Sequence, residues 1–541
     1  MKIMHPIART GNIWLHVENT CRFLLICLSF LVLPCSMLAA TVNGFVTRID
    51  SSTEIEIGTM RVVITPQTHC SIEALPKNSQ ANPATPASPC NLSQMTIGSR
   101  VKLTGNFAKN GEFIAARSKL EIGYVEPCKL CLLMTLHTHA PGDTPRVLAH
   151  GALSEESPAI TKNAQGWNGA WWIDGYPMDI DTSTRLISSP DSTVLYKLGA
   201  DILNGNPLEP KYHIHTVHEL RSSRLLSANT WVFYRAKYKA GYKPIAGQII
   251  LWPNQTSISE KKFLSMYTAT VKPPNYHLFT PSSLQYPHGT AIEIVHDQSI
   301  GTFIDHLGES LVPEYQKRLT SSDSTKVNFS FYVVHPFIYR EDSHFVSVDG
   351  KLPRGSYEDL AGDRYNAPKI NAYVRSVIAM PDGRVLIPDV LLAKMSNRSE
   401  VAALLSYAIT SILQKQAWNA WPITHPHHIR STSDYYLIYT LMAEDEQLLR
   451  LGIRQMYLAG YDIREAPYAW AVAQGKPVNN PVIDSKDPDK EIPWYAAYAF
   501  DYISKYYRDV DYSKLKRGEA EYQQFLQELR NADPEAFAPQ K

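Results

Sequence analysis

The sequence lacks an excess of charge of either sign. Its 541 residues include 53 lysines and arginines against 52 aspartates and glutamates. This balance excludes a chain-wide basic surface for nucleic acid and a uniformly acidic, solvating chain. Charged residues make up 19% and hydrophobic residues 44%, which is typical of a globular protein. The length predicts several domains, because single hydrophobic cores stop growing well below this size.

One apolar run without charge, residues 23–40, lies near the amino terminus after Arg9 and Arg22. A basic start, an apolar stretch and small residues at its end predict an export signal within residues 1–40. The 18-residue run is also long enough for an uncleaved signal anchor. We therefore expect an exported protein of the periplasm or cell envelope, which contacts a membrane only if this segment remains attached.

Cysteine is scarce, with seven residues in the chain, and four of them follow the expected signal. These four are Cys70, Cys90, Cys128 and Cys131. An even number in an exported chain predicts two disulfides, with the first two paired and the last two paired. The C-x-x-C spacing of the last two, which His137 and His139 follow, leaves metal binding and redox activity as alternatives.

Short β-strands are expected to dominate the chain after the signal. Residues 41–125 alternate apolar and polar side chains between glycine and asparagine turns, with a proline-rich loop inserted. Five short strands in this length predict a small, OB-like β-barrel. A similar order of strand patterns recurs over roughly residues 150–285. We expect residues 126–285 to form a second β-rich domain, either a repeat of the first or an unrelated β domain.

Residues 286–541 are predicted to be mainly helical. We expect an amphipathic helix over residues 303–319, and a hairpin turn at Pro381-Asp382-Gly383. Asn397 and Glu400 predict a capping box at the start of a buried helix, and a later long helix is expected to end before Gly460. The predicted fold class is therefore α+β and multidomain.

Three segments of this region carry a family resemblance. They are SVIAMPDGRVLIPDVLL at 376–392, EVAALLSYAITSI at 400–412 and DEQLLRLGIRQMYLAGYD at 445–462. In this order they resemble the HExxH zinc metallopeptidases related to the HtpX heat-shock protease and the BepA-type periplasmic proteases. The resemblance implies a zincin-like domain.

The residues that the family uses for catalysis are replaced. The pentapeptide in the position of HExxH reads Tyr407-Ala408-Ile409-Thr410-Ser411. Tyr407 and Ser411 stand where the resemblance implies zinc-binding histidines, and Ala408 stands where it implies the general base. Asp445 aligns with the glutamate ligand and Leu449 with the acid that orients the ligands. The substitutions predict neither zinc chemistry nor a catalytic residue here.

Side-chain volume and polarity suggest how such a helix would pack. We expect the apolar residues around Tyr407 to bury against the next helix, and the Tyr407 hydroxyl to bond with Asp445. The sequence then predicts a catalytically inactive, metallopeptidase-like binding or scaffold module without a cofactor. Its expected partner is a protein or peptide, not a nucleic acid.

Two other functions remain open. One is a zinc-dependent endopeptidase with non-standard ligands from two histidine clusters. These clusters are His213, His215 and His218, and His425, His427 and His428. The clusters lack the helical spacing of a zinc motif, and there is no G-x-S-x-G nucleophile motif. The other function is a structural envelope protein with a stable partner.

Overall fold

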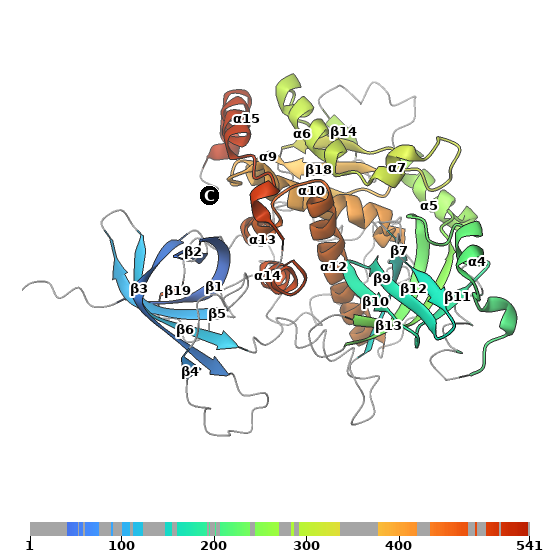
Figure 1. Ribbon diagram of the computed structural model, residues 1–541. Coiled ribbons are helices and arrows are strands. Elements are labelled where there is room, and N and C mark those ends of the chain that lie inside the picture. The colour runs from blue at the N-terminus through green and yellow to red at the C-terminus, as the bar shows by residue number, and fades with distance from the viewer. Residues whose placement is uncertain are drawn as a thin grey trace, which may run out of the picture.

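The computed structural model describes most of the chain after the expected signal. The described residues are 40–51, 53–57, 60–74, 88–89, 100–108, 112–122, 146–153, 160–191, 194, 198, 201, 206–238, 244–269, 283–285, 291–335, 377–418, 433–473, 482–483, 494–507 and 510–538. Two seven-stranded β-sheets, a two-stranded sheet of β14 (Ser283–Gln285) and β15 (Ala291–Glu293), and a mainly helical unit with its own small sheet form a mixed α+β fold (Figure 1). No helix within these ranges is long and apolar enough to cross a membrane.

The first sheet closes on itself. Its main strands are β1 (Ala40–Ser51), β2 (Glu54–Ile57), β3 (Met60–Ala74), β5 (Arg100–Phe107) and β6 (Phe113–Ile122). The pairings run β1–β2–β3–β6–β5 and return from β5 to β1, with β3 and β6 parallel. This ring agrees with the predicted small barrel. Two short strands extend it, β4 (Ser88–Pro89) beside β3 and β19 (Val482–Ile483) beside β1.

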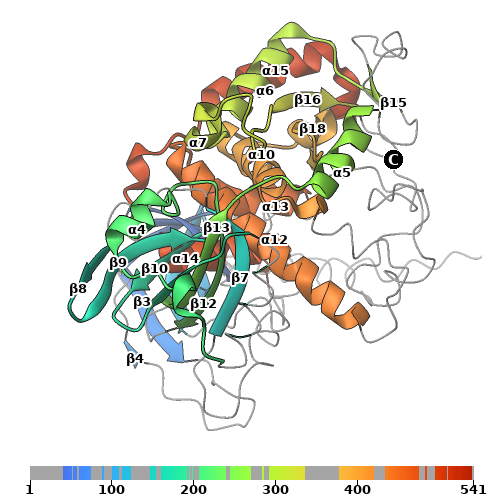
Figure 2. The same ribbon diagram turned by 90° about the vertical axis from the view of Figure 1, so that its right-hand side faces the viewer.

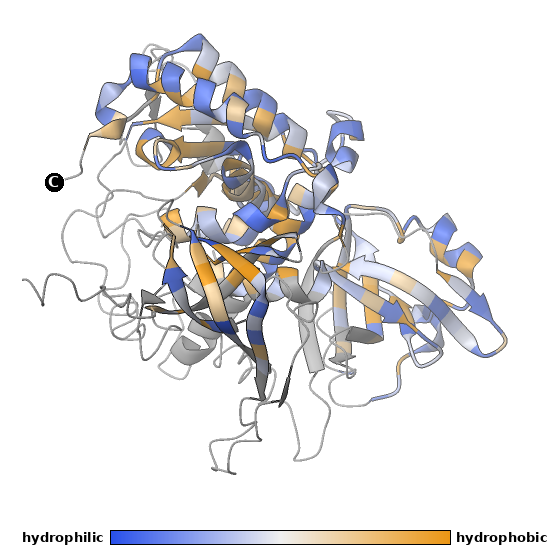
Figure 3. Ribbon diagram, turned by 60° about the vertical axis from the view of Figure 1, so that its left-hand side comes forward, coloured by the Kyte–Doolittle hydropathy of each residue, from blue (hydrophilic) through white to orange (hydrophobic). Residues whose placement is uncertain are grey.

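The second sheet is built around an antiparallel hairpin of its two longest strands. Its strands are β7 (Arg146–Ala152), β8 (Thr161–Asn163), β9 (Gly166–Ile173), β10 (Tyr176–Ile180), β11 (Arg185–Ser188), β12 (Thr230–Tyr238) and β13 (Pro244–Pro253). Buried residues alternate along β10, and Figure 3 shows hydrophobic and hydrophilic residues interleaved along the strands. The strand order is β7–β12–β13–β10–β9–β8, with β11 beside β13, and among the described residues no pairing joins β7 to β8. Whether the two β-rich units are a repeat stays a prediction.

The helical unit wraps a three-stranded sheet in the order β16–β18–β17. The sheet consists of β16 (Ser330–Val334), β17 (Ile378–Ala379) and β18 (Arg384–Pro388). The main helices are α6 (Gln298–Leu311), α10 (Arg398–Leu413), α12 (Ser433–Leu458), α13 (Ala466–Ala473), α14 (Trp494–Tyr506) and α15 (Glu519–Ala532). Helix α10 lies at the centre and packs against α12, α13 and α6 (Figure 2). Its burial on almost every side explains why its sequence is apolar on nearly every face.

The single helix predicted over residues 303–319 is wrong. Helix α6 ends at Leu311, and a separate short helix, α7 (Glu314–Arg318), follows. Pro313 is the N-cap of α7 and has an extended backbone. A proline there cannot donate the hydrogen bond that a continuous helix needs, so the chain breaks at this point.

The start of α10 and the end of α12 agree with the predicted caps in most respects. Asn397 accepts a hydrogen bond from the Glu400 amide at 3.0 Å. Glu400 accepts from the Ser396 amide at 2.6 Å, one residue before the position that a standard capping box uses. Gly460 follows α12 with φ of 81°, and the Tyr461 amide donates to the Met456 carbonyl, which completes a Schellman motif.

A buried ion pair attaches the second sheet to the helical unit. Arg450 on α12 bonds Asp174, in the β9–β10 turn, at 2.6 Å. Arg450 also donates to the Tyr498 hydroxyl, and Tyr234 donates to the same aspartate at 2.6 Å. Both charged side chains are at most 5% exposed. Because a buried charge is costly without its partner, this pair fixes the docking of the two units.

Candidate functional site

The candidate site lies where α10 crosses α12. Gly452 on α12 allows the close approach, because a side chain there would come within 3.2 Å of the Tyr407 amide. Facing this crossing are Tyr407 on α10 and Asp445 on α12. The predicted hydrogen bond is confirmed, since the Tyr407 hydroxyl donates to Asp445 Oδ1 at 2.8 Å.

Two further side chains complete the shell around the Asp445 carboxylate. The hydroxyl of Tyr495, on α14, donates to Asp445 Oδ2 at 2.7 Å. The side chain of Gln416 donates to the same carboxylate, and its oxygen accepts from the Ser411 hydroxyl at 2.7 Å. The three positions at which the resemblance implies zinc ligands, Tyr407, Ser411 and Asp445, are therefore linked by hydrogen bonds. We call this set of Tyr407, Ser411, Gln416, Asp445 and Tyr495 the tyrosine–aspartate network.

Aromatic rings enclose the network. The Tyr407 ring meets Trp470 edge-on at 4.8 Å between centroids, and Trp470 meets Tyr495 at 5.0 Å. Burial of the carboxylate raises the pKa of Asp445 above its usual value, and the hydrogen bonds from Tyr495 and Tyr407 oppose this rise. These donors are neutral, so the carboxylate is stabilised here without a cation.

The remaining family positions lie in the hydrophobic core. Ala408 is fully buried and Leu449 is 1% exposed. Both belong to one apolar cluster with their neighbours on α10, as the sequence predicted. A carboxylate at either position would have to displace this packing.

A cavity of about 210 Å³ opens beside the network. Ser411 and Gln416 belong to its wall, and Ala379 on the edge strand β17 lines the opposite part. Phe263 and Trp418, whose rings are 5.5 Å apart, give the wall an aromatic portion. The volume lies below the roughly 300–1,000 Å³ of typical small-molecule pockets. It suits one or two anchoring side chains better than a complete metabolite.

The predicted histidine clusters do not supply a metal site in the described part of the chain. His213 and His215 have ring centroids 6.2 Å apart, and His218 lies on the short helix α4 (Val217–Ser222). These three do not form a group with metal-ligand spacing. The second cluster, at residues 425–428, lies outside the described residues.

The structure describes only one of the four cysteines in the predicted disulfides. Cys70 lies half-buried in β3, whereas Cys90, Cys128 and Cys131 are outside the described residues. Strand β4 pairs with β3 so that Ser71 faces Pro89. Both disulfide pairings stay predictions. A thiol count under denaturing conditions would test both disulfides.

Comparison with known proteins adds no relative. No family model matches the chain, and no curated protein matches it in sequence. The family resemblance therefore remains a proposal, based on three sequence segments and their positions. Sequence reasoning found Tyr407, Ser411 and Asp445, but it missed Tyr495 and Gln416, because neither belongs to a motif with recognisable spacing.

Proposed function

We propose that this chain is an exported, catalytically inactive member of the HExxH metallopeptidase fold that binds extended protein segments. In this proposal residues 41–125 form an OB-like barrel, and residues 286–541 form a zincin-like domain. The observation that carries it is the tyrosine–aspartate network. Neutral donors occupy the positions that would hold zinc, and each one bonds the remaining carboxylate directly or through Gln416.

The proposed binding site is the cavity beside β17. Among the described residues, strand β17 is the outer strand of its sheet, and its Ala379 borders the cavity. A peptide in extended conformation could add to such an edge and insert an anchor side chain between the aromatic rings. The cavity wall also contains the Lys415–Glu260 ion pair, 2.9 Å long, and several amide side chains, which offer polar contacts to a peptide backbone.

Fluorescently labelled β-casein tests binding and cleavage in one experiment. We expect fluorescence anisotropy to report saturable binding, with no cleavage products and no effect of a chelator on the labelled casein. Ala379→Phe, which fills the cavity from β17, should weaken binding at least 10-fold. Thr302→Phe, which adds the same side chain at an exposed position of α6, is the matched control and should bind normally.

Other results would favour the alternatives. Cleavage that stops on chelation would establish a zinc-dependent endopeptidase with non-standard ligands. Absence of casein binding in the intact protein, together with a stable envelope complex, would establish the structural alternative. Equal binding by both variants would move the binding site away from β17.

A further inference from the structure

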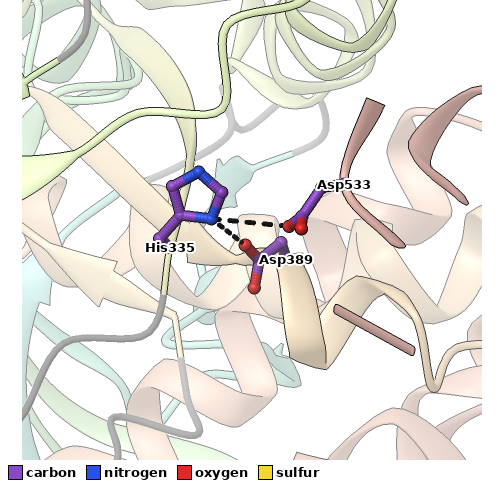
Figure 4. Close-up of side chains that lie close together, drawn as sticks. All are labelled: His335, Asp389 and Asp533. Carbon is purple, nitrogen blue, oxygen red and sulfur yellow. Dashed lines mark hydrogen bonds and ion pairs between the residues drawn. The ribbon is translucent and has the colours of Figure 1, made fainter. Parts of the chain in front are cut away.

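A histidine and two aspartates converge at one edge of the small sheet (Figure 4). Strands β16 and β18 are parallel, and Val334 lies opposite Pro388 at their carboxyl ends. The next residues, His335 and Asp389, therefore leave the sheet side by side. Asp533 joins them from the carboxyl end of α15, where it is the N-cap of the short helix η9 (Pro534–Phe537).

The three side chains point at one another at short distances. His335 Nδ1 lies 2.8 Å from Asp389 Oδ2 and 3.4 Å from Asp533 Oδ2. All three candidate ligand atoms lie within 4.8 Å of one another. The side chains of Asp389 and Asp533 are 1% and 7% exposed, whereas that of His335 is 38% exposed. An ion therefore has a route from solvent along the imidazole.

The donors around the two carboxylates are too few. Asp389 accepts from the Val390 amide and shares a hydrogen bond with His335 Nδ1. Asp533 Oδ2 is buried and accepts no hydrogen bond of good geometry from the described residues, although its carboxyl lies close enough to that of Asp389 to share a proton with it. A buried carboxylate without enough donors must share a proton or pair with a cation.

The geometry fits a cation better than a network of hydrogen bonds alone. Zinc sites with an open position use three protein ligands plus water, and imidazole nitrogen and carboxylate oxygen are both ordinary zinc ligands. Ligand atoms about 2.1 Å from a tetrahedral ion are separated by about 3.4 Å. The 3.4 Å separation of His335 Nδ1 and Asp533 Oδ2 equals this value, and the 2.8 Å contact with Asp389 needs only a small opening.

We propose that His335, Asp389 and Asp533 bind a Zn²⁺ ion that holds α15 and the carboxyl-terminal segment against the sheet. The ligands come from three parts of the chain, so the ion cross-links β16, the start of α9 (Asp389–Leu392) and the end of α15. This site is separate from the tyrosine–aspartate network and does not depend on the proposed peptide binding.

Isothermal titration with ZnCl₂ tests the site on the full exported chain after removal of metal by EDTA. We expect saturable binding in the wild type, and a loss of affinity of at least about 10-fold in Asp533→Asn and in His335→Gln, because removing even an outer-shell partner commonly costs that much. Asp445→Asn is the matched control. It changes another shielded carboxylate of the same unit and should leave Zn²⁺ affinity unchanged.

Thermal unfolding supplies a second measurement. Saturating Zn²⁺ should raise the Tm of the wild type and of Asp445→Asn, because a ligand that binds only the folded state stabilises it. The Tm of Asp533→Asn should not change when Zn²⁺ is added. His335 is partly exposed, so His335→Gln keeps the test decisive if the aspartate variant fails to fold. Zn²⁺ binding that both variants retain, or no saturable binding in the wild type, would overturn the proposal.

Discussion

Two groups of shielded carboxylates in the helical unit have opposite surroundings. Asp445 accepts hydrogen bonds from two tyrosine hydroxyls and from Gln416. Asp389 and Asp533 share one imidazole, and Asp533 Oδ2 receives no hydrogen bond of good geometry from the described residues. The site that resembles a zinc centre in sequence is therefore satisfied by neutral donors, and the site without a motif is the one that we propose for a cation.

The difference shows that the number of hydrogen-bond donors around a buried carboxylate, more than its burial, decides whether the carboxylate is inert or needs an ion. Burial raises the pKa of Asp445 and that of Asp389 above the usual range. For Asp445 the surrounding hydrogen bonds oppose the rise, whereas for Asp389 the nearby Asp533 adds to it. A search for metal sites in such chains should therefore count unsatisfied oxygens as well as motif spacing.

The largest effect is expected from placing a carboxylate at the centre of α10. Ala408→Glu would put a larger, charged side chain where no residue surface is exposed. Overpacking and charge burial together should lower the free energy of unfolding by at least about 3 kcal/mol. Urea denaturation measures the change, with Thr302→Glu on the exposed face of α6 as the control. A variant as stable as the wild type would show that α10 can accept a catalytic glutamate.

Glu400 tests what burial does to a carboxylate with few donors. It is 4% exposed, and burial, with Glu465 nearby, raises its pKa to about 8. The folded state then holds a proton that the unfolded state releases near pH 4.5. The contribution of this group to the free energy of unfolding is largest below pH 4.5 and is lost as the pH rises to about 8. The loss amounts to about a few kcal/mol.

Glu400→Gln should remove this pH dependence. The amide keeps an acceptor for the Ser396 N–H and carries no charge. We expect the variant to gain stability over the wild type between pH 5 and 8, and to match it in acid. Urea denaturation at several pH values measures the difference between the two proteins, so that other titrating groups cancel. Parallel pH curves would contradict the prediction.

Sequence patterns identified the contact between α10 and α12 because its signals are local. Asn397 marks the start of one helix and Gly460 the end of the other, and apolar residues fill the faces between them. A tyrosine in a buried position needs a partner for its hydroxyl, which pointed to Asp445. The break at Pro313 was also visible in the sequence, but the helical pattern on both sides concealed it.

Contacts between distant segments could not be predicted in the same way. The site of His335, Asp389 and Asp533 joins the end of a strand, the start of a short helix and the end of α15. No fixed spacing connects such residues, because the fold alone brings them together. The two-residue strand β19 likewise carries no periodic signal, although it joins the carboxyl-terminal half of the chain to the first barrel.

Removing one donor from the tyrosine–aspartate network should have a moderate effect. Tyr407→Phe deletes the 2.8 Å hydrogen bond to Asp445 and leaves the Tyr495 and Gln416 bonds in place. A hydrogen bond to a charged group contributes about 1.5–3 kcal/mol, and we expect the lower end because other donors remain. Tyr332→Phe, at a half-buried position of β16, is the control. Equal unfolding free energies for the two variants would show that the network adds no stability.

The smallest effect is expected at Ser411, where the network reaches the cavity. Its hydroxyl donates to Gln416 Oε1 at 2.7 Å and lies in a half-buried position. Ser411→Ala should therefore lower the free energy of unfolding by only about 0.5–1 kcal/mol, since water can replace the lost donor. Casein affinity should stay within about 2-fold of the wild type, a difference of roughly 0.4 kcal/mol. If Ser411→Ala weakened casein binding as strongly as Ala379→Phe, the tyrosine–aspartate network would contact the bound segment directly. The network would then recognise the bound segment and not only pack the two helices together.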